Sequence, residues 1–483
     1  MRGRGKGVDG LVDWSYCIEF PLINALVNTN KAVCEAAAGA CFGFDNLRCA
    51  GQAEPPRCRC QMEPCLPFRF VHTADLHLDS PLKSLALRDS ALAEVIGNAS
   101  RAAFTRIIDL CLEEAVDALL IAGDLYDGAQ TSMKTARFLT QGLRRLDAAG
   151  IETFIIRGNH DAESRITAQL VLPPSVTVFG AQAGVERRSR GALEVAIHGI
   201  SFARPHAPDS LLGRFKAPVP GAVNIGMLHT SLDGAAGHDP YAPCRLADLQ
   251  GSGFDYWALG HIHARAHHAG GCHVVMPGIP QGRDIGEAGA KSVTLVTVAD
   301  DGAMSVEARA TAVARFERVE VPLDGAEDWP GVVAALSGAL RAARRDHGED
   351  HLVLRPVLTG RTPLLWRLRR DQGLLLDEAR LTAEGIGTLW IDKVELACTD
   401  DAPPDTAGPL AELGRQIAGM TTPPAAILAE ADAVIEALAK TLPKELRGML
   451  GDDPATQAAI RDALLQEGAA EVLAHLHGLE GDA

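Results

Sequence analysis

Aspartate, asparagine and histidine recur in short motifs along the middle of the chain, and these residue types hold divalent cations in proteins. Each motif follows an apolar run typical of a buried strand. Parallel α/β sheets carry their chemistry where strands end and loops begin, so these motifs should meet at one edge of a sheet. The predicted metal ligands are Asp75, His77, Asp124, Asn159, His229, His261 and His263.

The spacing of these residues indicates a site for two ions. A cation pair about 3.5–4 Å apart needs a bridging ligand, and a carboxylate such as Asp124 does this best. Asp75 and His77 are two positions apart, as are His261 and His263. In an extended segment this spacing places both side chains of a pair on one side, so each pair can direct two ligands at the same place.

His160 is the predicted catalytic residue. It directly follows Asn159, so it cannot easily turn toward the same ion and is free to act on a substrate. Two bound cations would lower the pKa of a bridging water, and the resulting hydroxide would attack phosphorus. His160 would stabilise the developing charge or protonate the leaving oxygen. Mixed Asp, Asn and His ligation suits Mn²⁺, Fe²⁺ or Zn²⁺ better than Mg²⁺, and we favour Mn²⁺. Among the other histidines, His206 is a candidate substrate contact.

Composition narrows the class of protein. The 483 residues are 47% hydrophobic and 22% charged, with a net charge of −16. This balance argues against a generally basic surface that coats DNA, although bound metal ions and a local basic patch could still receive a phosphate backbone. No stretch approaches the ~18 apolar residues of a membrane span, and no signal peptide is expected. The scattered cysteines after residue 67 are typical of buried thiols in a reducing cytoplasm.

The chain divides into four parts by pattern. Seven of the 11 cysteines precede residue 67, in a segment that we interpret as a poorly structured leader. The alternative is a small metal clip at Cys58, Cys60 and Cys65, but their spacing departs from the usual C-x2-C pairs. The expected parts are the leader at 1–67, a site-bearing domain at 68–300, an α+β module at 314–397 and a helical, acidic region at 409–483.

The sequence pattern of the site-bearing domain predicts an α/β fold. Residues 68–156 alternate strand, helix, strand, helix, strand with short connections, which predicts parallel strands joined by right-handed crossovers. After Asp161 the strand candidates follow one another with few helices between them. A second sheet packed on the first, with helices on the outer faces, is the expected solution. The domain should end at the turn 299–302.

These motifs resemble those of the calcineurin-like metallophosphoesterases. The opening His-Thr-Ala-Asp-Leu-His-Leu at 72–78 is most similar to the SbcD-type DNA repair exonucleases, especially their YhaO-like branch. Gly-Asp-Leu-Tyr-Asp at 123–127, Gly-Asn-His-Asp at 158–161, Gly-His-Ile-His at 260–263 and Pro-Gly-Ile-Pro-Gln-Gly-Arg at 277–283 add to the likeness. The resemblance implies a four-layer αββα sandwich, a small α+β capping domain and a helical C-terminal region.

The resemblance also implies how the site is divided. One ion would be held by Asp75, His77, Asp124 and His263. The other would be held by Asp124, Asn159, His229 and His261, and His160 would take the family's catalytic role. The family usually works on DNA with an SMC-like coiled-coil ATPase, and often as a homodimer. The helices after Pro409 would either dock such a partner or pack on the body of the protein.

The motifs and the resemblance leave three alternative functions. The first is a metal-dependent DNA exonuclease and endonuclease in DNA repair. The second is a phosphatase or phosphodiesterase for a small phosphate ester, and the third is a non-catalytic subunit that recruits a partner. A DNA nuclease needs an open trough with a basic rim. The capping module offers five arginines for such a rim, Arg355, Arg361, Arg367, Arg369 and Arg370.

Overall fold

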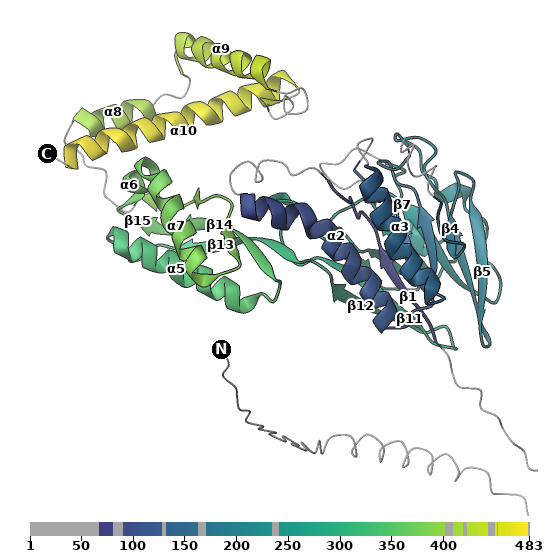
Figure 1. The fold of residues 1–483 in the computed structure, drawn as a ribbon. Helices are drawn as coiled ribbons and strands as arrows, with labels where there is room; N and C mark the ends of the chain where they lie inside the picture. Colours follow the sequence, from purple (N-terminus) through teal and green to yellow (C-terminus); the bar gives the residue numbers. More distant parts are fainter. Residues whose placement is uncertain are drawn as a thin grey trace, which may run out of the picture. The chain divides into compact units, whose positions relative to one another are not determined.

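A computed structural model describes residues 67–80, 90–127, 132–162, 171–233, 241–400, 409–418, 423–442, 450–451 and 453–481. Residues Glu63–Ala483 group as one compact unit. Figure 1 shows the order of its elements along the chain. The proposed leader and its cysteine cluster lie outside the described residues.

The first sheet has six strands in the order β12-β11-β1-β2-β3-β4. Strands β1, β2 and β3 run parallel, and β2 at Ala118–Ala122 is fully apolar because both faces of the sheet are covered. Figure 1 shows α2 and α3 together on one face. The bounds are β1 Phe68–Thr73, α2 Ser90–Glu113, β2 Ala118–Ala122, α3 Met133–Ala148, β3 Glu152–Ile156, β4 Val176–Val178, β11 Ser292–Val298 and β12 Met304–Ala310.

The second sheet also has six strands, in the order β5-β6-β7-β8-β10-β9. Strand β7 is buried along its whole length and runs parallel to both of its neighbours. The bounds are β5 Gly184–Arg190, β6 Leu193–Gly199, β7 Val223–His229, β8 Tyr256–Gly260, β9 Ala266–His268 and β10 His273–Met276.

The two sheets pack face to face through one apolar core, which includes Phe70, Phe154 and Tyr256. A second core joins the first sheet to α2 and α3. A third core lies on the outer face of the second sheet, around Trp257. Helical cover there is short, with α4 at Leu246–Gln250, η3 at Leu212–Arg214 and adjoining loops. The expected four layers are therefore present, and the outer layer on this side is thin.

The sequence does not predict three edge strands, β5, β9 and β12. β5 has four charged residues among its seven, and every residue of β5 and β12 is partly or fully exposed. Edge strands often carry charge in this way, and in β5 the charged run hides the alternation of apolar residues. In β12 the alternation is present, as Met-Ser-Val-Glu-Ala-Arg-Ala, but the strand lies beyond the turn that predicts the end of the domain. The turn 299–302 joins β11 to β12 in the same sheet. The expected end of the site-bearing domain at residue 300 is thus corrected, because the sheet continues to Ala310.

The capping module, residues 314–397, has a core of its own around Leu336 and Leu354. Residues 389–396 contain two short strands, both parallel to β14. The sequence does not predict helices α6 and α7, and in α7 the run Leu374–Leu376 blurs the helical period. The bounds are β13 Ala314–Pro322, α5 Trp329–Asp346, β14 His351–Thr359, β15 Arg361–Thr362, α6 Leu365–Arg370, α7 Gln372–Ile386, β16 Leu389–Ile391, β17 Glu395–Leu396 and, just beyond, β18 Thr399–Asp400.

The C-terminal region is helical, as predicted, with α8 at Pro409–Ala418, α9 at Ala425–Thr441 and α10 at Pro454–Gly481. Helix α10 contacts α6 of the capping module as well as α8 and α9. Ala474 of α10 is buried, whereas none of the described residues of α9 is buried. Among the described residues no helix has the length and apolar character to cross a membrane.

Candidate metal centre

The loops that follow β1 and β2 are joined by backbone hydrogen bonds. Asp75 N donates to Gly123 O at 3.0 Å, and His77 N donates to Asp124 O at 3.1 Å. Asp75, His77 and Asp124 all have positive φ angles, of 52°, 40° and 52°. Residues other than glycine rarely adopt this left-handed backbone conformation. Such backbone strain is concentrated at functional sites, where the surrounding structure enforces it.

Asp161 is the last residue of the motif at 158–161 and has no predicted role. In the structure it links two of these loops. Its carboxylate accepts hydrogen bonds from Leu125 N at 3.0 Å, from Tyr126 N at 3.3 Å and from Gly158 N at 3.3 Å. Burial, together with the nearby charge of Asp124, raises the pKa of Asp161 to about 7. Asp161 therefore supports the loops that carry Asp124 and Asn159.

One group of potential ligands contains Asp75, His77 and His263, whose ligand atoms lie within 4.8 Å of one another. His77 Nε2 lies 3.1 Å from His263 Nε2. His263 Nδ1 lies 2.7 Å from Glu287 Oε1, so this nitrogen carries the proton and Nε2 offers its lone pair. Two ligand atoms bound to one cation at about 2.1 Å are about 3 Å apart, so the pair fits a shared ion.

A second group contains Asp75, Asp124 and His229. His229 Nδ1 donates to Ala122 O at 2.9 Å, which leaves Nε2 as the ligand atom. That nitrogen lies 3.4 Å from Asp124 Oδ2 and 3.0 Å from Asn159 Oδ1. Three electron-rich atoms converge here in a buried place, an arrangement that a cation would stabilise. Burial lowers the pKa of His229, but Asp124, Asp75 and the hydrogen bond to Ala122 together raise it to about 9, so a proton on His229 can balance the carboxylates in the absence of metal.

Asp75 belongs to both groups, so it is placed as well as Asp124 to bridge two ions. Its carboxylate also accepts two hydrogen bonds from His261 N, at 3.0 and 3.1 Å. The ring of His261 lies 5.2 Å from that of His229 and 5.1 Å from that of Tyr241. All seven predicted ligands thus come together at the edge where the two sheets meet.

Two glycines keep room for these ligands. A Cβ atom on Gly158 would lie 2.2 Å from Asp124 Oδ1 and 2.8 Å from His229 Nε2. A Cβ atom on Gly123 would lie 2.4 Å from His229 Nδ1, and the φ of Gly123 is 97°. The close approach of the ligands to both glycines is visible only in three dimensions.

His160 lies next to this cluster. Its ring is 5.1 Å from that of His77, and its side chain is 39% exposed. Nδ1 of His160 lies 3.2 Å from Oδ1 of Asp127, and these two residues form a third group of potential ligands with His77. The hydrogen bond to Asp127 raises the pKa of His160. Asp127 was not singled out from the sequence, although its motif was.

His206 and the arginines of the capping module fit their predicted roles less well. His206 is exposed, and its ring lies 6.2 Å from that of Tyr241, which in turn contacts His261. It therefore lies beside the cluster without joining it. Arg355 is paired with Asp392 and Glu395, and Arg370 with Asp371. These carboxylates neutralise part of the expected basic rim.

The comparisons with known proteins agree with this geometry. The model for the calcineurin-like phosphoesterases matches residues 68–265, and the model for the middle domain of metallophosphoesterase YhaO matches residues 316–399. The chain is 33% identical to the uncharacterized metallophosphoesterase YhaO of Bacillus subtilis over 312 residues, which cover 63% of this chain and 75% of that protein. The chain belongs to the calcineurin-like metallophosphoesterases.

More distant relatives connect the phosphoesterase to DNA repair proteins. The chain is 28% identical to the DNA double-strand break repair protein Mre11 of Methanopyrus kandleri, over 44% of this chain and 49% of that protein. It is also 28% identical to Mre11 of Sulfurisphaera tokodaii, over 41% and 49%. The chain thus spans about half the length of these relatives. As a member of its family it is a hydrolase of phosphoric esters, and the family uses divalent metal ions.

Proposed function

We propose that this phosphoesterase is a Mn²⁺-dependent DNA nuclease that acts in DNA repair. The observation that carries the proposal is the convergence of two carboxylates, one amide and four histidines, with the exposed His160 beside them. The Mre11 relatives support DNA as the substrate. We divide the chain as the sequence predicts, except that the domain with the metal centre extends to Ala310, and we assign the capping module the role of positioning DNA.

Bound ions would supply a hydroxide at neutral pH and neutralise charge on the phosphate. We assign one ion to Asp75, His77, Asp124 and His263, and the other to Asp124, Asn159, His229 and His261. His160 would protonate the leaving oxygen. Its Nδ1 lies against Asp127, so Nε2 is the nitrogen that can face a substrate, and Asp127 favours the protonated ring.

The alternative is a phosphodiesterase for a small phosphate ester. It is favoured by the paired arginines of the capping module and by the net charge of −16. A complete set of ligands speaks against a non-catalytic subunit. If the protein is a nuclease, the helices after Pro409 would dock an SMC-like coiled-coil ATPase or a second copy of the chain. Helix α10 already packs on α6.

One assay separates the alternatives. The full chain with Mn²⁺ is given linear duplex DNA, single-stranded DNA and a chromogenic phosphodiester in parallel, with His160→Ala as the control for contaminating nucleases. A DNA nuclease cuts at least one DNA substrate, and the variant does not. Turnover of the small diester with both DNAs intact would replace our proposal with the alternative. Failure of the wild type on all three substrates would favour a non-catalytic subunit.

A further inference from the structure

We propose that Glu287 and Arg283 position the metal ligand His263, and that Gln281 ties them to the capping module. The capping module would then influence how tightly one of the two ions is held. The inference rests on the proposed metal centre and goes beyond it, because none of these three residues is among the predicted ligands. The evidence lies in the segment 278–291, which connects β10 to β11.

Glu287 holds the ring of His263. Its Oε1 atom lies 2.7 Å from His263 Nδ1, and the side chain of Glu287 is only 11% exposed. A carboxylate behind a ligating imidazole fixes the tautomer, fixes the ring orientation and raises the basicity of the other nitrogen. That other nitrogen, Nε2, is the atom that faces His77 at 3.1 Å. Glu287 therefore acts on the ion through His263 and does not need to touch it.

Arg283 fixes Glu287 in turn. Its Nη2 donates to Glu287 Oε1 at 2.6 Å, and Arg283 N donates to Glu287 Oε2 at 2.8 Å. The same guanidinium lies 3.9 Å from Asp127 Oδ2, the carboxylate whose other oxygen contacts His160. The guanidinium of Arg283 thus lies between Glu287, which orients His263, and Asp127, which orients His160.

The other side of this segment is bonded to the capping module. The buried side chain of Gln281 donates to Ala314 O at 2.6 Å and accepts from Val313 N at 2.9 Å. Gly289 N donates to Phe316 O at 2.9 Å. Gln281 precedes Glu287 in the sequence and Gly289 follows it. The start of the capping module is therefore bonded to this segment both before and after Glu287. A shift of β13 would therefore displace the segment that presents Glu287.

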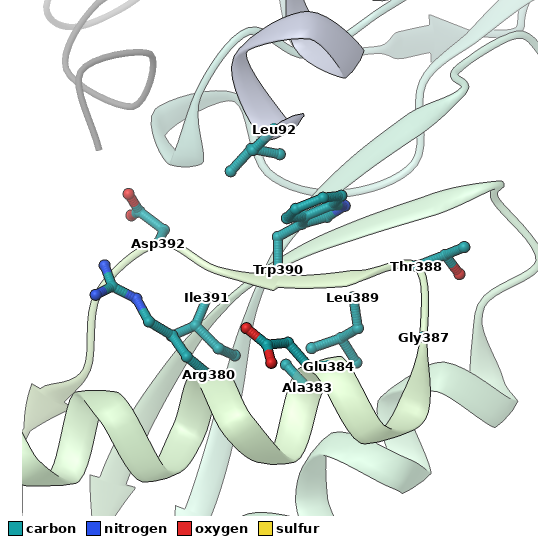
Figure 2. A pocket seen from close by; sticks show the side chains of 10 residues that line it. All are labelled: Leu92, Arg380, Ala383, Glu384, Gly387, Thr388, Leu389, Trp390, Ile391 and Asp392. Carbon is teal, nitrogen blue, oxygen red and sulfur yellow. The ribbon is translucent and has the colours of Figure 1, made fainter. Parts of the chain in front are cut away.

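Other contacts join the capping module to α2 without using this segment. Arg106 of α2 donates to Ala312 O at 2.5 Å and to Asp350 Oδ2 at 2.6 Å. Figure 2 shows Leu92 of α2 facing the ring of Trp390, beside a cavity of 310 Å³. Loss of the Arg106 contacts would remove bonds between α2 and the capping module, but the bonds of Gln281 and Gly289 would still hold β13 to the segment that presents Glu287. Arg106 therefore provides a matched control.

The test measures Mn²⁺ binding to the full chain by calorimetry, with metal content per chain determined in parallel. In Glu287→Gln the amide oxygen still accepts from His263 Nδ1 but lacks charge, whereas Glu287→Ala loses the acceptor. We expect the affinity for one ion to fall about 10- to 100-fold in Glu287→Ala, with a smaller fall in Glu287→Gln and an unchanged second ion. The visible spectrum of the Co²⁺-loaded protein should change in the same graded order.

Gln281→Ala tests the link to the capping module. We expect it to weaken the same ion although Gln281 contacts no predicted ligand, and we expect Arg106→Ala to leave both affinities unchanged. The double variant Gln281→Ala/Glu287→Ala should lose less affinity than the sum of the single losses, because both act through one route. Equal weakening of both ions, or the same selective loss in Arg106→Ala, would overturn the inference.

The wild type separates this inference from the proposed function. If the wild-type chain binds no pair of ions, the proposed metal centre is wrong. If it binds two ions and Glu287→Ala retains both affinities while it remains folded by circular dichroism, only the positioning role is wrong.

Discussion

Nδ1 of His160 lies 3.2 Å from Oδ1 of Asp127, and Ser80 Oγ donates to the other oxygen of Asp127 at 2.6 Å. The carboxylate is thus held in place on one side and orients the histidine on the other. This relationship makes Asp127 a positioning residue for the proposed general acid.

Asp127→Asn should shift the dependence of activity on pH. The carboxylate raises the pKa of His160, and a general acid works in its protonated form, which is present below its pKa. Removal of the charge lowers that pKa, so the alkaline limb of the profile should move to lower pH. Activity near neutral pH should fall about 10- to 100-fold. An unchanged alkaline limb, with normal metal content, would contradict this role of Asp127.

His160→Ala should lose cleavage while it keeps its ions. The side chain is 39% exposed at the margin of the cluster, and the other ligands are in place without it. We expect a fall in kcat of at least about 100-fold, the usual scale for loss of a proton donor. Metal content by mass spectrometry should stay near that of the wild type. Cleavage of substrate at the normal rate by this variant would refute the assignment.

Asp124→Ala should lose both ions if Asp124 is the bridge. Its Oδ2 atom lies 3.4 Å from His229 Nε2 and 3.9 Å from His77 Nε2, so it borders both groups of ligands. Asp75→Ala is the matched comparison, because Asp75 also belongs to both groups. Retention of two ions per chain in Asp124→Ala, with loss in Asp75→Ala, would transfer the bridging role to Asp75.

Gly158→Ala should damage the metal centre far more than the fold. The added methyl group would lie 2.2 Å from Asp124 Oδ1, so the ligands must move apart. We expect loss of metal affinity and activity at a modest cost in stability. Gly338→Ala is the control, because nothing lies within 4 Å of the added atom in α5. That change should stabilise the helix by about 0.5–1 kcal/mol. Normal Mn²⁺ binding by Gly158→Ala would show that the site tolerates the displacement.

Much of the fold follows from local pattern. Runs such as Ala-Leu-Leu-Ile-Ala at 118–122 predict a strand buried on both faces, and the structure has it at these positions. The edge strand β5 is hidden in the sequence, because its charged residues replace the period of two. The edge strand β12 has that period, but it follows the turn at 299–302, which predicts the end of the domain. Helix α7 is likewise hidden, since helical period is hard to read where leucines are consecutive.

The sequence by itself determined the residue types of the metal centre and their order at strand ends, because a parallel sheet gathers such ends at one edge. Only the tertiary structure decided which atoms meet. It set the tautomer of His229 through Ala122 O, brought Asp75 into both groups of ligands, and placed Glu287 behind His263. Contacts of this kind join residues more than twenty positions apart, and their distances depend on how two sheets and a connecting segment pack. No local pattern encodes that packing.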